Sequence, residues 1–143
     1  MESPPVIHTH RYREVDGFDY ESNDCTVIVF QVAFGVTYKQ AHALIKFAGR
    51  KRGDGFQLGT LLDILHEQEY VLQGKVVTRW ENKWGKKYRI SDFLRDHPQG
   101  TYIVGVRAHV MCIKDGVIYD SNEGKAIKND HCIVYFHEIQ DKI

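Results

Sequence analysis

The sequence predicts an α+β protein in which N-terminal helices pack on a C-terminal antiparallel sheet. Two observations carry this prediction. Helix caps and helically spaced apolar residues extend from about residue 24 to residue 65, whereas residues 101–136 hold four apolar, β-branched runs separated by turns. Helices followed by strands is the order of an α+β fold, and a chain of 143 residues fits one domain with one core.

Residues 1–22 show no periodic pattern, so we expect them to form an extended N-terminal arm of the single domain 1–143. His8 and His10 lie close together in this arm. A zinc site needs three or four protein ligands, however, and no Cys or His at ligand spacing accompanies the pair. We therefore expect no metal and no other cofactor.

The central element is the apolar run of residues 26–34. Its β-branched residues favour a strand by propensity alone. The spacing of the apolar residues instead predicts a helix whose core-facing stripe is Cys25, Ile28, Val29, Val32 and Ala33. Asn23 or Asp24 would cap this helix, and Gly35 would end it. The run therefore predicts a central helix buried on most sides.

Thr37 and Gln40 form the sequence pattern of a capping box, which predicts a second helix that ends at Gly49. A third short helix is expected from Thr60 to residue 65. The second helix would bury one face, made of Tyr38, Ala41, Ile45 and Ala48.

After Gly74 the pattern changes to that of strands, starting with residues 75–80. Ser91 would cap one more short helix over residues 92–96, and a turn follows at residues 98–100. Four further strands are expected at residues 101–106, 108–113, 117–121 and 131–136.

The charge balance gives no long-range field that would draw the protein to nucleic acid or to a membrane, since 19 basic and 19 acidic residues cancel. No apolar run approaches the roughly 20 residues that span a bilayer. The first residues also lack the charged and apolar regions of a signal peptide. We therefore expect a cytoplasmic protein that binds no membrane.

Three cysteines cannot all pair, and a cytoplasmic setting keeps them reduced. Cys112 and Cys132 lie in strand-like runs, where we expect small buried thiols. Cys25 differs because it follows capping residues at the head of a helix. Free amide groups and the helix dipole stabilise a thiolate at that position.

Asp115-Gly116 predicts a hairpin with a two-residue type I′ turn. The turn pairs Lys114 with Val117, Ile113 with Ile118, Met111 with Asp120 and His109 with Asn122. Asp120 then lies diagonal to His109 on one face of the hairpin, so that its carboxylate can reach the imidazole. Asn122, directly opposite His109, competes for the same contact.

Nucleophilic catalysis by cysteine needs three groups: a thiol at a helix N-terminus, a histidine that holds it as a thiolate, and an acid or amide that orients the ring. The order Cys25, His109 and Asp120 on helix, strand and next strand resembles papain-fold cysteine peptidases, including leader-peptide peptidases of bacterial export systems. It is most similar to short uncharacterised papain-like proteins of bacteriophage genomes. The shared segments, within residues 18–136, are Asn23-Asp24-Cys25, Ala48-Gly49-Arg50-Lys51 and Ala108-His109.

The resemblance implies that Cys25 is the nucleophile, that His109 is the general base and acid, and that Asp120 orients His109. Papain-like enzymes place a Gln several residues before the cysteine, and this chain has none there. Asn23 is the substitute candidate for the oxyanion donor, together with the backbone N–H of Cys25. Asn122 is the alternative orienting residue.

The implied function is a cysteine-dependent hydrolase of peptidase, isopeptidase or deamidase type, which acts on a protein or peptide in the cytoplasm, that of the host if the protein is phage-encoded. A first alternative keeps the papain-like fold in a catalytically weak protein that binds a host protein. A second alternative is a nucleic-acid-binding module, because residues 50–52 and 83–89 interleave basic and aromatic residues. The zero net charge argues against it. The remaining histidines on predicted helices and strands are expected to be structural or at the surface.

Overall fold

The computed structural model describes residues 4–15, 17–18, 21–22, 24–51, 53, 75–81, 87–107, 109–121 and 131–141. Its elements are β1 (Val6–His8), α1 (Tyr12–Val15), α2 (Cys25–Phe34), α3 (Tyr38–Phe47), β2 (Lys75–Glu81), α5 (Ile90–Asp96), β3 (Thr101–Val106), β4 (His109–Lys114), β5 (Val117–Asp120) and β6 (Ile133–Asp141).

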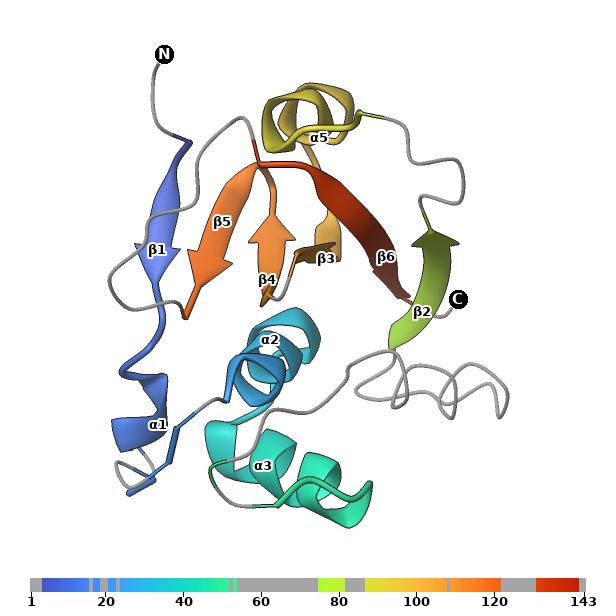
Figure 1. The fold of residues 1–143 in the computed structure, drawn as a ribbon. Coiled ribbons are helices and arrows are strands. Elements are labelled where there is room, and N and C mark those ends of the chain that lie inside the picture. The colour runs from blue at the N-terminus through green and yellow to red at the C-terminus, as the bar shows by residue number, and fades with distance from the viewer. Residues whose placement is uncertain are drawn as a thin grey trace.

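The sheet has six strands in the order β1-β5-β4-β3-β6-β2, with helices on both faces (Figure 1). Helix α2 lies between the sheet and α3, whereas α5 packs on the opposite face. The predicted α+β class, with N-terminal helices packed on a largely antiparallel sheet, is confirmed. The prediction of a purely antiparallel C-terminal sheet is wrong, because β1 pairs in parallel with β5 and β2 joins the other edge.

The N-terminal segment is more ordered than the extended arm that we expected. Its residues 6–8 form the edge strand β1, and residues 12–15 form the short helix α1. Beyond the strand, the backbone N–H of Thr9 donates to the carbonyl of Asp120 at 2.8 Å. The segment therefore supports the end of β5 through long-range pairing, which local sequence patterns do not display.

Helix α2 confirms the helical interpretation of the apolar run, and eight of its ten residues are buried. Packing against the sheet on one side and α3 on the other outweighs the strand propensity of its β-branched residues. Gly35 ends it in the left-handed conformation, with φ 69°. Asp24 occupies the N-cap position, but its side chain makes no capping hydrogen bond, so the prediction of a side-chain cap from Asp24 is wrong.

The capping box of Thr37 and Gln40 is present, with both of its hydrogen bonds, and α3 ends at Phe47, two residues before Gly49. The predicted helix from residue 60 to residue 65 lies outside the described residues. Ser91 is not the cap of α5. Helix α5 begins at Ile90, and the Asp92 carboxylate accepts a hydrogen bond from the Arg89 N–H at 3.0 Å, which puts Ser91 inside the first turn.

The hairpin of β4 and β5 has the predicted register: Lys114 pairs with Val117 and Ile113 with Ile118. Both turn residues have positive φ, 47° at Asp115 and 80° at Gly116, as a type I′ turn requires. Strand β6 is displaced from its predicted range of residues 131–136, because it begins at Ile133 and pairs with β2 as far as Asp141.

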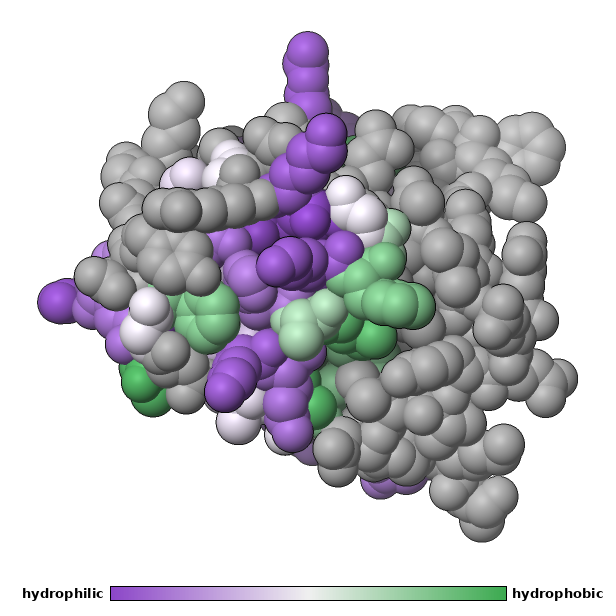
Figure 2. All heavy atoms as spheres, turned by 90° about the horizontal axis from the view of Figure 1, so that it is seen from below, coloured by the Kyte–Doolittle hydropathy of each residue, from purple (hydrophilic) through white to green (hydrophobic). Residues whose placement is uncertain are grey.

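Two apolar clusters lie on the two faces of the sheet. One joins α2 and α3 to the sheet and contains Cys112, whose predicted burial is confirmed. The other joins α5 to Met111, Ile113 and neighbouring residues. The predicted burial of Cys132 is wrong, since it precedes β6 and is exposed. On the face that carries α3, hydrophilic side chains occupy much of the described surface and apolar ones border them (Figure 2).

Candidate active site

Three side chains from three different elements meet at one end of the sheet. Cys25 is the first residue of α2, His109 the first of β4, and Asp120 the last of β5. The end of a helix or strand suits a reactive residue, because regular structure holds its backbone in place while its side chain lies at the edge of the core. The structure brings together the three residues that the sequence singled out for a triad.

The contact between His109 and Asp120 is short and sheltered. Nε2 of His109 lies 2.6 Å from Oδ1 of Asp120, and the Asp120 side chain is fully buried. The predicted reach of the carboxylate to the imidazole is confirmed. Because Nε2 faces Asp120, the other ring nitrogen, Nδ1, is the one left to face the thiol of Cys25, with which His109 also hydrogen-bonds.

The thiol of Cys25 is surrounded by donors. Burial opposes its ionisation, but hydrogen bonds from His109, from the Thr26 hydroxyl and from the Val110 backbone N–H outweigh burial and lower the pKa of Cys25 below its ordinary 9.0. For His109, burial favours the neutral ring, whereas the bonds to Asp120 and Cys25 raise its pKa to about 9. Together these shifts favour a thiolate-imidazolium pair near neutral pH.

Of the two oxyanion donors predicted from the sequence, the structure describes only the backbone N–H of Cys25. Asn23 and Asn122 both lie outside the described residues, so neither predicted role can be placed. Cys25 is the first residue of α2, and the side chain of the N-cap residue, Asp24, makes no hydrogen bond to the amide groups of the first turn. Amide groups of the first helical turn have no intrahelical acceptor, which makes them donors for a developing negative charge.

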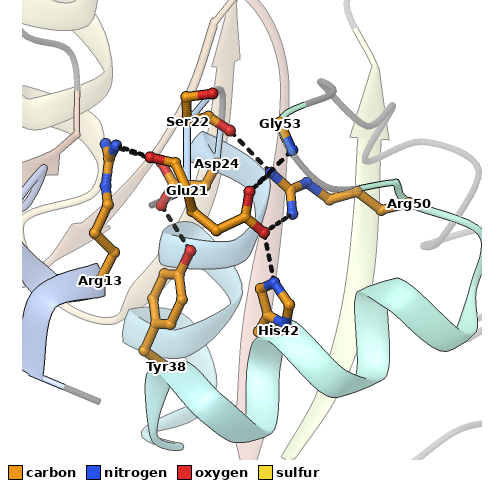
Figure 3. A network of polar contacts seen from close by, with 8 residues as sticks. All are labelled: Arg13, Glu21, Ser22, Asp24, Tyr38, His42, Arg50 and Gly53. Atoms are coloured by element: carbon orange, nitrogen blue, oxygen red, sulfur yellow. Dashed lines mark hydrogen bonds and ion pairs between the residues drawn. The ribbon is translucent and has the colours of Figure 1, made fainter. Parts of the chain in front are cut away.

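A buried polar network holds Glu21 and Ser22, which precede the nucleophile Cys25 by a few residues (Figure 3). Glu21 is 2 % exposed, and its carboxylate accepts hydrogen bonds from Arg50 at 2.8 and 3.3 Å and from the Gly53 N–H at 2.9 Å. His42 Nε2 lies 2.5 Å from the same carboxylate. Arg50 also donates to the Ser22 carbonyl at 2.9 Å, which ties the backbone as well as the side chain.

Asp24 extends this network to the residue directly before Cys25. Its carboxylate lies 3.1 Å from a guanidinium nitrogen of Arg13 and accepts a hydrogen bond from the Tyr38 hydroxyl at 2.8 Å. Arg13 in turn donates to the backbone carbonyl of Glu21. Helices α1 and α3 therefore hold the segment before Cys25 from two sides, which fixes the position of the thiol (Figure 3).

Sequence reasoning missed this network. Arg50 was singled out within the motif Ala48-Gly49-Arg50-Lys51 and as part of a basic surface, yet it is 5 % exposed and paired with Glu21. Its burial removes one of the basic residues from the proposed nucleic-acid surface. A buried Arg near a buried Glu can be found only once the turn after α3 has brought residue 50 back to residue 21.

Replacing Asp120 by Asn tests the electrostatic role of the carboxylate. We expect the pKa of His109 to fall from about 9, because the negative charge that stabilises the imidazolium is removed. An NMR titration of the His109 ring protons measures this change. Asp96→Asn, at an exposed carboxylate, is the matched control, and an equal shift in both variants would contradict the assignment.

Within the ranges described, no group of three or more His, Cys, Asp or Glu residues is arranged to hold a metal ion. None of the helices seen there is long and apolar enough to cross a membrane. No family model, no curated protein and no solved structure matches the chain.

Proposed function

We propose that the protein is a cysteine-dependent hydrolase of papain-like type, which attacks an amide, isopeptide or thioester carbonyl through Cys25. The observation that carries the proposal is the hydrogen-bonded chain from Cys25 through His109 to Asp120 at the N-terminus of a buried helix. A cysteine or a histidine with a purely structural role does not need the other beside it, so their pairing favours a catalytic role.

In the proposed reaction the thiolate of Cys25 attacks the carbonyl carbon, so that a bond from sulfur to carbon forms. His109 gives its proton to the leaving group as the scissile bond breaks, and a thioester remains on Cys25. His109, now neutral, then takes a proton from water as the water attacks the thioester, and the thiolate is released. Asp120 holds the imidazole in one orientation and stabilises its charged form throughout.

The substrate class proposed is a protein or peptide, in keeping with the papain-like resemblance. Peptide hydrolysis, isopeptide hydrolysis and side-chain deamidation all use the same thioester step, so one set of residues serves each of them. The partly exposed thiol of Cys25 allows a carbonyl to approach it.

The test is a mass-spectrometric survey of a proteome-derived peptide mixture incubated with the protein. We expect new peptide termini or newly formed carboxylates with the native protein and none with Cys25→Ala, since loss of the nucleophile removes the thioester step. Cys132→Ala, which removes an exposed thiol that is not part of the triad, is the matched control and should retain the activity. Identical products from the native protein and Cys25→Ala would overturn the proposal.

A further inference from the structure

A tyrosine on β6 lies in the same row of the sheet as Val110, whose backbone contacts the thiol of Cys25. Tyr135 pairs with Gly105 across β6 and β3, and Gly105 pairs with Val110 across β3 and β4. The Val110 N–H is one of the donors to the Cys25 thiol. The tyrosine therefore begins a row of three paired residues, Tyr135, Gly105 and Val110, and the thiol lies beside the last of them.

The glycine lets the tyrosine ring lie across the sheet toward the thiol. A Cβ at Gly105 would come within 2.2 Å of Cε1 and 2.3 Å of Cζ of Tyr135, so the ring rests on the bare backbone of Gly105. Cζ carries the hydroxyl, which has thus crossed the whole spacing from β6 to β3. Neighbouring strands lie about 4.8 Å apart, and one such spacing separates Gly105 from Val110.

The ring also stacks on the ring of a buried histidine. His137 stacks on Tyr135 with the ring centroids 5.0 Å apart and the planes at 22°. His137 is itself buried, and its Nδ1 accepts a hydrogen bond from the Trp80 N–H at 3.3 Å. Both Tyr135 and Cys25 pack, partly buried, against the apolar cluster on the α2 face of the sheet. The tyrosine therefore has a defined place on the face that carries the thiol.

A carbonyl group under attack has to reach a nucleophile and an oxyanion donor at the same time. A reacting carbon stands about 3 to 3.5 Å from its nucleophile, and an oxyanion stands about 2.7 to 3.1 Å from its donor. Cys25 would supply the nucleophile, and Tyr135, on the same face of the sheet, would supply the donor for the carbonyl oxygen. Papain-like enzymes use a Gln before the cysteine for this purpose, and this chain has none.

We propose that Tyr135 is an oxyanion donor of this site, with its hydroxyl hydrogen-bonded to the carbonyl oxygen of the substrate while Cys25 attacks the carbon. The inference rests on the proposed hydrolase function and deepens it. The Tyr135 hydroxyl donates its hydrogen to the oxygen as negative charge develops there, keeps its own proton, and acts beside the backbone N–H of Cys25.

The electrostatic setting keeps Tyr135 in the form that this role needs. Burial and the neighbouring Cys25 thiolate raise the pKa of Tyr135 to about 12, so the hydroxyl stays protonated across the working pH range. A protonated phenol can donate a hydrogen bond to an oxyanion, whereas a phenolate would repel one.

Two reagents separate this role from a general effect on the thiol. p-Nitrophenyl acetate acetylates a thiolate through a tetrahedral oxyanion and releases nitrophenolate, whereas iodoacetamide alkylates it by displacement of iodide, without an oxyanion. For Tyr135→Phe we expect Cys25 acetylation to slow by about 100-fold, the effect of losing one oxyanion donor. Alkylation by iodoacetamide should stay within about twofold of the native rate, because the thiolate is unaltered.

Tyr119→Phe is the matched control, since Tyr119 packs against the same cluster on β5 and should leave both rates unchanged. Gly105→Ala provides a second variant: the added methyl displaces the Tyr135 ring, and acetylation should fall toward the rate of Tyr135→Phe. In the double variant, Gly105→Ala should add no further loss.

The outcomes are distinguishable. Equal acetylation by the native protein and Tyr135→Phe would overturn the donor role and leave the hydrolase proposal standing. An equal fall in acetylation and alkylation would also overturn it, because the residue would then act through the thiolate or the fold. A native protein that is alkylated rapidly but never acetylated at Cys25 would overturn the hydrolase proposal and the donor role together.

Discussion

Replacing His109 by Ala is expected to raise the pKa of the Cys25 thiol above its ordinary 9.0, because burial then acts without the imidazolium that opposes it. Alkylation of Cys25 by iodoacetamide at pH 7 should slow by at least about tenfold, since the thiolate is the reacting form. The rate is measured against pH by mass spectrometry of the peptide that contains Cys25.

A second cysteine, Cys132, serves as an internal reference for this experiment. Cys132 is exposed and is not a member of the triad, so its alkylation should follow the same pH profile in the native protein and in His109→Ala. His131→Ala, at an exposed histidine, should leave the alkylation of Cys25 unchanged. A Cys25 profile that is indifferent to His109→Ala would refute the ion pair.

The pH dependence of the native site follows from the same pair. Thiolate reactivity should appear below pH 9, because the pKa of Cys25 is lowered, and the imidazolium needed to protonate a leaving group should be lost as the pH rises through about 9. Activity is therefore expected as a bell between these two titrations. A rate that keeps rising beyond pH 10 would contradict the assignment of His109 as the acid.

Replacing Arg50 by Met is expected to destabilise the fold by about 3 to 5 kcal/mol, since Glu21 is left with a buried charge and without its bidentate partner. The free energy of unfolding in urea measures the loss. The double variant Arg50→Met with Glu21→Gln should recover part of it, because the unpaired charge is removed as well. Arg95→Met, at an exposed ion pair, is the control and should leave the free energy of unfolding close to that of the native protein.

Protonation of Glu21 at acid pH should destabilise the fold, as Arg50→Met does. Burial favours the protonated form of Glu21, but the hydrogen bonds from Arg50, His42 and Gly53 prevail and lower its pKa from 4.5 to about 2. The carboxylate thus contributes stability that is complete above pH 4.5 and lost as the pH falls from 4.5 to about 2. In Arg50→Met this acid-sensitive part should shrink, and an unchanged pH profile would contradict the pairing.

Local rules accounted for the elements that hold the triad. The helical spacing of residues 25–34 and the turn at Asp115-Gly116 depend only on neighbouring residues, so the sequence predicted both α2 and the hairpin register. From these it also predicted that Asp120 reaches His109. Where a segment has no local pattern, as in residues 6–8, the sequence predicted an arm and the structure has an edge strand.

Only the tertiary structure decided which distant segments of the chain contact one another. The sequence by itself determined which residues carry reactive groups and how helix, strand and turn present them, because caps, periodicity and turn chemistry act over a few residues. Packing decided that Asp24 binds Arg13 and Tyr38 instead of capping α2, that Arg50 is buried against Glu21, and that Tyr135 lies across Gly105. Each of these contacts joins segments far apart in the chain, and only the folded core brings them within bonding distance.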